Sequence, residues 1–142
     1  MKISIGNDHA GYELKSKIIQ MLTHQGHYLS DCGTHNTESC DYPDYAHRVM
    51  HSLTSGETEL SILICGTGNG VCMTANKYAG VRSALCWNEE IARLARQHND
   101  ANVLCLPARF ITTEEALKII EVFLNTEFEG GRHQNRIDKI NI

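Results

Sequence analysis

The sequence predicts an α/β protein: a single Rossmann-like domain with a five-stranded parallel sheet and helices on both faces. Short apolar, β-branched segments alternate with amphipathic segments along the whole chain, as in successive βαβ units. The segment Leu60–Cys65 (LSILIC) is almost continuously apolar, which is typical of a strand buried on both faces. The length of 142 residues matches one domain. We therefore expect residues 1–142 to form one unit.

The first half of the chain predicts three strands and two helices. Lys2–Gly6 alternates in polarity and carries β-branched residues, so we expect a strand. Apolar residues then recur every three or four positions over about Gly11–Gln25, which indicates a helix. Tyr28–Asp31 is a short second strand before a turn. A polar loop leads to a helix over about Pro43–Leu53, because proline suits a first helical turn. Leu60–Cys65 is the third strand.

The second half continues the alternation. A helix follows the glycine-rich loop and extends through Lys77, and Val81–Cys86 is the fourth strand. Glu89 to about Gln97 is a helix with acidic residues in its first turn and an asparagine cap before it. Val103–Leu106 is the fifth strand. Thr113–Asn125 is an amphipathic helix with a threonine cap, and a short basic helix closes the chain after a Gly-Gly break.

Composition excludes several classes of function. The formal net charge is −4 and no basic run is present, so we expect no nucleic-acid partner. The apolar stretches are far shorter than the ~20 residues of a membrane span, and the N-terminus lacks the apolar core of a signal peptide. The six cysteines lack the spacing of a small disulfide-stabilised fold. We expect a cytoplasmic protein with free thiols and no membrane contact.

The loop after the third strand is the clearest candidate site. Its sequence, Cys65 followed by GTGNG, places three glycines at alternate positions before a helix, an arrangement that favours an anion-binding nest of backbone amides. The Gly-Lys-Ser/Thr ending of a mononucleotide loop is absent, and no dinucleotide fingerprint follows the first strand. Cys65 at this position could act as a thiolate base or nucleophile. The alternatives are a tight turn and a small buried side chain.

Other polar residues are expected at the same sheet edge, because parallel strands bind ligands at their carboxyl ends. Asp8 and His9 follow the first strand, and the loop with Tyr42 follows the second; Asp8 could equally be a turn residue. Arg132 and Arg136 are spaced i, i+4, which suits an anion held between two guanidinium groups or a solvated basic face. Arg109, after the fifth strand, could join them.

Two histidine groups need separate interpretation. His47 and His51 are spaced i, i+4, but no third ligand or glutamate base accompanies them, so we expect surface histidines and no metal. His98 lies between a helix and the start of the fifth strand, at the amino edge of the sheet, whereas Cys65 is at the carboxyl edge. If both serve one site, that site must be shared across a dimer. Alternatively, His98 only caps its helix.

Six blocks of sequence together resemble ribose-5-phosphate isomerase type B, over Ile3 to Ile140. The family also contains galactose-6-phosphate isomerase subunits and allose-6-phosphate isomerases. The blocks are GNDHAGYELK, DYPDYA, LICGTGNG followed by ANK, GVRSALC, ARQHNDANVLCLPAR and FEGGRHQNRI. The resemblance implies a cofactor-free and metal-free aldose–ketose isomerase of the pentose phosphate pathway. It also implies a homodimer or a dimer of dimers with active sites at the subunit interface.

The resemblance also assigns roles to the candidate residues. Cys65 would be the base that moves a proton between C2 and C1 through a cis-enediol(ate), with Thr67 and the loop amides holding the oxyanion. His98 would open the furanose ring and Asp8 would bind or polarise the sugar oxygens. The remaining residues would bind substrate: Tyr42, Gly66, Gly68, Asn69, Gly70 and Asn99 around the sugar, and His9, Arg109, Arg132 and Arg136 at the phosphate.

Several alternatives remain at the level of sequence. Some relatives place a glutamate after the glycine loop as the base; Val71 stands there and the thiol is present, so the chain fits the cysteine branch. The substrate could be ribose 5-phosphate or the six-carbon allose 6-phosphate or galactose 6-phosphate. A non-catalytic phosphosugar-binding module would keep the arginines but could lose Cys65, Thr67 or His98, all of which are present. A redox protein would need a resolving cysteine close to Cys65.

Overall fold

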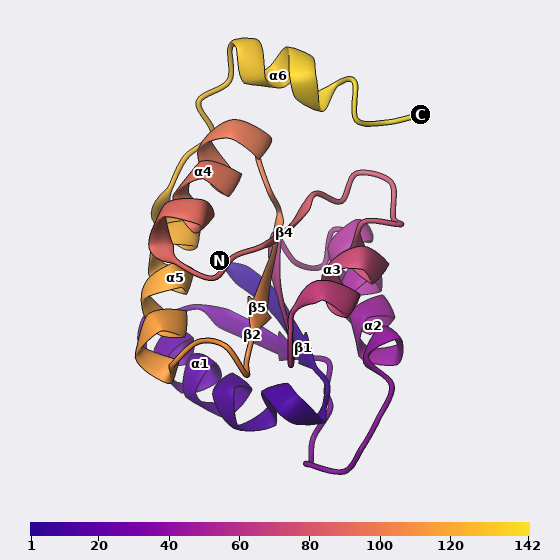
Figure 1. Cartoon of the computed structure of the whole chain (residues 1–142), viewed down its shortest axis with the longest axis vertical. Helices are drawn as coiled ribbons and strands as arrows, with labels where there is room; N and C mark the ends of the chain where they lie inside the picture. The colour runs from indigo at the N-terminus through magenta and orange to yellow at the C-terminus, as the bar shows by residue number, and fades with distance from the viewer.

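The computed structural model describes residues 1–142 and contains one sheet of five parallel strands (Figure 1). The strand order is β2-β1-β3-β5-β4, so the fold class predicted from the sequence is confirmed. In the two central pairs of strands, Ile3 lies opposite Leu60 and Ser61 lies opposite Val103. The strands are β1 (Lys2–Asn7), β2 (Tyr28–Asp31), β3 (Leu60–Cys65), β4 (Ser83–Leu85) and β5 (Val103–Pro107).

Helices cover both faces of the sheet, and each face has its own apolar core. The helices α1, α4 and α5 pack on one face, where Phe123 and Ile18 are fully buried. The helices α2 and α3 pack on the other, around Val49 and Leu63. The helices are α1 (Tyr12–His24), α2 (Tyr42–Thr54), α3 (Asn69–Ala75), α4 (Glu89–Asn99), α5 (Thr113–Asn125) and α6 (Arg132–Ile137), with a 3-10 turn at His9–Gly11. No helix has the length and apolar character that crossing a membrane requires.

The predicted caps of the two C-terminal αβ helices are confirmed. The side chain of Asn88 accepts a hydrogen bond from the Ile91 amide at 2.9 Å and begins α4. Thr112 begins α5 in a capping box, in which its hydroxyl accepts from the Glu115 amide and the Glu115 carboxylate accepts from the Thr112 amide. These contacts satisfy amides that a helix N-terminus leaves without partners.

Several element bounds differ from the sequence prediction by one or two residues. Helix α3 ends at Ala75, two residues before Lys77, where the sequence predicts its end. Helix α4 continues two residues beyond Gln97, because Asp100 takes a left-handed conformation (φ 45°) that ends the helix there. Its carboxylate is held by Arg82 at 3.3 Å and by Arg96 at 3.2 Å. Strand β4 is shorter than predicted, since it pairs with β5 alone at the edge of the sheet. His98 therefore lies within the last turn of α4, not after it.

The strand order reverses between β1 and β3, which places a switch point at the carboxyl ends of these neighbours. The strand that follows β1 in the chain, β2, lies on one side of this pair, and the strands that follow β3 lie on the other side. In parallel α/β sheets this reversal opens a crevice where ligands bind. Asn7 and Cys65 are the last residues of the two strands. The topology of the sheet therefore predicts the candidate site in the loops after β1 and β3.

Candidate active site

Cys65 lies at the switch point with its sulfur enclosed by the glycine loop. The side chain is buried, and Sγ accepts a hydrogen bond from the Gly68 amide at 3.1 Å. Gly68 has φ +75°, and a Cβ at this position would meet the side chain of Leu85 and the backbone of Leu106, so only glycine fits. The backbone amide directed at Sγ is the donor that a negatively charged sulfur needs.

Three side chains named from the sequence lie around this loop. The Tyr42 ring, at the start of α2, packs directly against Gly70 and leaves no space for a Cβ there. The Arg109 guanidinium lies along Gly66, and the Arg109 amide donates to the Gly66 carbonyl at 3.0 Å. Thr67 is exposed, and its hydroxyl accepts from the Asn69 amide at 3.3 Å. A tyrosine and an arginine thus pack on the loop beside Cys65, and the loop itself carries an exposed threonine.

Asp8 and His9 complete the group at this edge. The buried Asp8 caps the 3-10 turn, with its carboxylate accepting from the Ala10 amide at 2.9 Å, and its own amide donates to β3 at Ile64. The His9 Nδ1 atom accepts from the Cys40 amide at 3.3 Å. A ring whose Nδ1 accepts carries its proton on Nε2, so His9 presents Nε2–H as a donor even when neutral.

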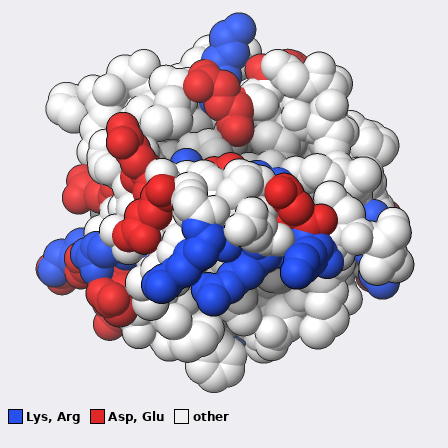
Figure 2. All heavy atoms as spheres, turned by 90° about the horizontal axis from the view of Figure 1, so that it is seen from above, with Lys and Arg blue, Asp and Glu red and all other residues white.

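The remaining predicted residues lie at the opposite edge of the sheet. His98 and Asn99 are in the last turn of α4, and exposed Arg132 and Arg136 are on α6, which packs against α4 (Figure 1). Seen from this end, Lys and Arg side chains form a row across the surface with acidic groups beside it (Figure 2). The structure thus divides the predicted site into two groups, as the topology predicted for Cys65 and His98.

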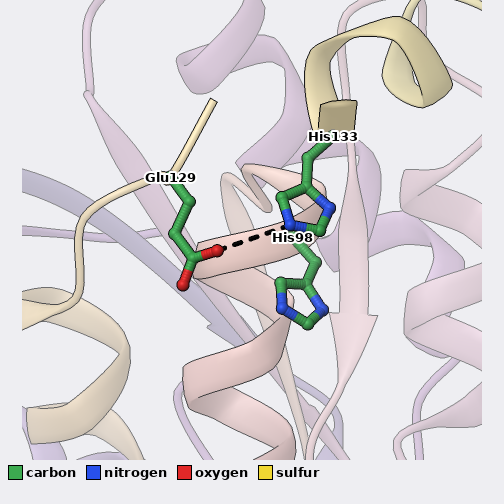
Figure 3. Close-up of side chains that lie close together, drawn as sticks. All are labelled: His98, Glu129 and His133. Atoms are coloured by element: carbon green, nitrogen blue, oxygen red, sulfur yellow. Dashed lines mark ion pairs between the residues drawn. The ribbon is translucent and has the colours of Figure 1, made fainter. Parts of the chain in front are cut away.

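Two residues that sequence analysis did not single out adjoin His98. The buried His133 stacks on its ring, with ring centroids 4.3 Å apart and planes inclined by 14°. The Glu129 carboxylate lies 3.4 Å from Nε2 of His133 (Figure 3). The i, i+4 spacing of Glu129 and His133 is the only signal in the sequence, and it is common on helices. Their contact with His98 depends on how α6 packs on α4.

A cavity of about 760 Å³ opens at the same edge of the sheet. It lies between the chain segment after α3 and the C-terminal residues, and Asn99 lines it together with Arg82 and Ile140. Figure 1 shows the C-terminal segment extending away from the body of the molecule beyond α6. The cavity therefore borders the group of residues around His98, not the group around Cys65.

All six cysteines are free thiols in the structure, and two of them, Cys72 and Cys105, form a cluster around the Ser83 hydroxyl, which lies 3.4 Å from the Cys72 sulfur and 3.0 Å from the Cys105 sulfur. The Cys72 sulfur receives hydrogen bonds from the Cys105 thiol, the Ser83 hydroxyl and the Leu85 amide, and these lower its pKa from 9.0 to about 6 despite partial burial. Burial raises the pKa of Cys105 well above 9.0 and that of Cys86 to about 12. Of these three thiols Cys72 has the lowest pKa, and in its neutral form it donates to the Ser83 carbonyl at 3.4 Å.

This cluster predicts a pH-dependent stability. Because the pKa of Cys72 is about 6 in the fold and 9.0 in the unfolded chain, the unfolded chain binds the extra proton between these values. Stability from this group is therefore fully present above about pH 9 and is lost as the pH falls through about 6. We expect the urea midpoint to rise between pH 6 and 8.5 less steeply in Cys72→Ala than in the wild type. Equal slopes would contradict the assignment.

Comparisons with known proteins agree with these features. The family model described as ribose/galactose isomerase matches residues 3–140. Ribose-5-phosphate isomerase B of Escherichia coli is 44% identical over 139 residues, covering 98% of this chain and 93% of the relative.

Two solved structures are also closely similar to this chain. A ribose 5-phosphate isomerase of Thermotoga maritima superimposes with a TM-score of 0.96 at 51% identity, covering 98% of this chain and 96% of the other. Ribose-5-phosphate isomerase B of Mycoplasma genitalium, solved with bound ribulose 5-phosphate, has a TM-score of 0.94 at 49% identity, covering 98% and 93%. The chain belongs to the ribose/galactose isomerase family and is an aldose–ketose isomerase.

Proposed function

We propose that this enzyme interconverts D-ribose 5-phosphate and D-ribulose 5-phosphate in the cytoplasmic pentose phosphate pathway, with Cys65 as the base and residues 1–142 as one isomerase domain. The observation that carries the proposal is the buried Cys65 sulfur at the switch point, which accepts the Gly68 amide. The relatives named for ribose 5-phosphate, one of them with ribulose 5-phosphate bound, support the substrate.

In this proposal the reaction is a proton transfer between adjacent carbons. The Cys65 thiolate removes the proton from C2 of the open-chain aldose, and the electron pair moves to the C1 carbonyl oxygen to give a cis-enediolate. Amides of the loop Gly66–Gly70 and the Thr67 hydroxyl stabilise the developing negative charge. The proton of the C2 hydroxyl then passes to O1, while the Cys65 thiol returns a proton to C1. This gives the ketose and regenerates the thiolate.

The other residues open the sugar ring and hold the substrate. His98 gives a proton to the ring oxygen as its bond to C1 breaks, and Asp8 polarises the sugar oxygens. Tyr42 and Asn99 contact the sugar, and the phosphate is bound by His9, Arg109, Arg132 and Arg136. Because the phosphate is remote from C1 and C2, its binding orients the reacting carbons and supplies binding energy for the transition state.

The proposed site needs two copies of the chain. Cys65 ends β3 at the carboxyl edge of the sheet, whereas His98 lies in the last turn of α4 and precedes β5 at the amino edge. One subunit therefore supplies Cys65 and the glycine loop, and its partner supplies His98 with the arginines of α6. We propose a homodimer or a dimer of dimers with sites at the subunit interface.

The test is turnover of the purified enzyme in the presence of EDTA, with D-ribose 5-phosphate and D-allose 6-phosphate as separate substrates. We expect ribulose 5-phosphate to form from ribose 5-phosphate, since every step uses protein side chains and backbone amides. Turnover of the six-carbon substrate alone would overturn the pentose assignment. Binding of both sugar phosphates with no turnover would show a phosphosugar-binding protein instead.

A further inference from the structure

His98 lies beside two side chains that the proposed reaction does not use, those of His133 and Glu129. Its ring lies against the His133 ring at 4.3 Å between centroids, with planes only 14° from parallel. Beside the two rings, the Glu129 carboxylate is paired to Nε2 of His133 at 3.4 Å (Figure 3). Glu129 is itself tied to α4, because its amide donates to the Gln97 carbonyl at 3.1 Å, one residue before His98. The three side chains form a closed cluster.

The burial of these residues shows which of them is fixed. The His133 side chain is only 7% exposed, whereas that of Glu129 is 50% exposed. Helix α6 has six residues, and His133 and Ile137 are the two that it buries. A short helix gains little stability of its own, so its position depends on these side chains. His133 therefore connects α6 to the last turn of α4 and presents a fixed aromatic face to His98.

The cluster is not arranged to bind a metal ion. Its candidate ligand atoms lie within 4.8 Å of one another. The lone pair of an imidazole nitrogen lies in the plane of its ring, and the two ring planes are nearly parallel. Lone pairs in parallel stacked planes do not converge on one point, as tetrahedral coordination would need. Stacking is the interaction that this geometry provides.

We propose that His133, held by Glu129, is a positioning residue that keeps the His98 imidazole in the orientation needed for ring opening. This inference rests on the proposed function, in which His98 acts on the sugar ring. A ring stacked against a fixed partner has restricted rotation about its side-chain torsions. General acid catalysis depends on such restriction, because a displacement of about 1 Å can cost about 10²-fold in rate.

The chemistry of the two substrates separates ring opening from isomerisation. Ribose 5-phosphate is a furanose, so the C1–O4 bond must break, with a proton added to O4 and one lost from the C1 hydroxyl. Ribulose 5-phosphate cannot form that ring, since its C5 oxygen carries the phosphate, and it binds as an open chain. Exchange of its C1 hydrogen with solvent deuterium needs Cys65 but no ring opening. A positioning role for His133 therefore affects one reaction and not the other.

The test compares His133→Ala with the wild type in both reactions. We expect kcat for ribose 5-phosphate to fall about 10- to 100-fold with little change in KM, while deuterium exchange at C1 of ribulose 5-phosphate stays within about twofold. His133→Phe restores most of the lost kcat, because it keeps an aromatic ring on His98. Glu129→Gln gives a smaller loss of the same kind. The control is His24→Ala, a substitution of an exposed histidine, which leaves both reactions unchanged.

A double variant tests whether the loss of kcat in His133→Ala depends on His98. His98→Asn with His133→Ala is expected to be no slower on ribose 5-phosphate than His98→Asn alone. A rise in KM with equal loss of both reactions would overturn the proposal, because it would mean that α6 and its arginines had moved. Unchanged kcat in His133→Ala would overturn it as well, and so would failure of His133→Phe to restore kcat. Absence of turnover in the wild type would instead reject the proposed function.

Discussion

Replacing Cys65 with alanine is expected to lower kcat for ribose 5-phosphate by about 10²- to 10⁴-fold, the range that general base catalysis supplies. The variant removes the sulfur that would take the C2 proton. The Gly68 amide, which donates to Sγ in the wild type, becomes free to bind the substrate oxygen. We therefore expect KM to change much less than kcat. The measurement is steady-state turnover, with deuterium exchange at C1 of ribulose 5-phosphate as a second readout.

The matched control is Cys86→Ala. Cys86 is also fully buried, and burial raises the pKa of its thiol to about 12, so it remains a neutral apolar side chain. We expect this variant to keep wild-type turnover and to lose a modest amount of stability. Substrate should also protect Cys65 from a thiol alkylator. If Cys65→Ala keeps more than about a tenth of wild-type kcat, the base has been misassigned.

The sequence predicted the core of the fold because apolar patterns and caps are local signals. The bounds of β2, β3 and α5 agree with the predicted ranges. The Asn88 cap is confirmed, and of the two threonines that could begin α5 the structure shows Thr112. The end of α4 was missed. It is set by Asp100 in a left-handed conformation with Arg82 and Arg96 on its carboxylate, and Arg82 comes from a segment distant in sequence.

The places of the candidate residues on the fold were easier to predict from the sequence than their contacts. Cys65 and the glycine loop follow a strongly apolar strand, so their place at the sheet edge follows from the alternation of elements. The contacts of Tyr42 with Gly70 and of Arg109 with Gly66 join residues more than 25 positions apart, and no local pattern encodes them. His133 was missed for the same reason, because its stacking on His98 depends on the path of the chain after α5.

The division of the site between two sheet edges leads to the second large effect. Cys65→Ala and His98→Asn are each expected to be nearly inactive as pure proteins. A mixed dimer of the two variants contains one site with both residues intact and one site with neither, if each site takes Cys65 from one subunit and His98 from its partner. Random pairing makes half of the dimers mixed, and half of their sites intact. The mixture then recovers about a quarter of wild-type activity.

The most direct measurement is therefore the activity of Cys65→Ala and His98→Asn after co-refolding from urea at equal concentrations, beside wild type and each variant refolded alone. The wild type sets the recoverable activity, and the separately refolded variants set the background. Recovery of about a quarter of wild-type turnover is the result that an interfacial site predicts. A mixture no more active than the separate variants would contradict a site shared between subunits and would require Cys65 and His98 to act within one chain.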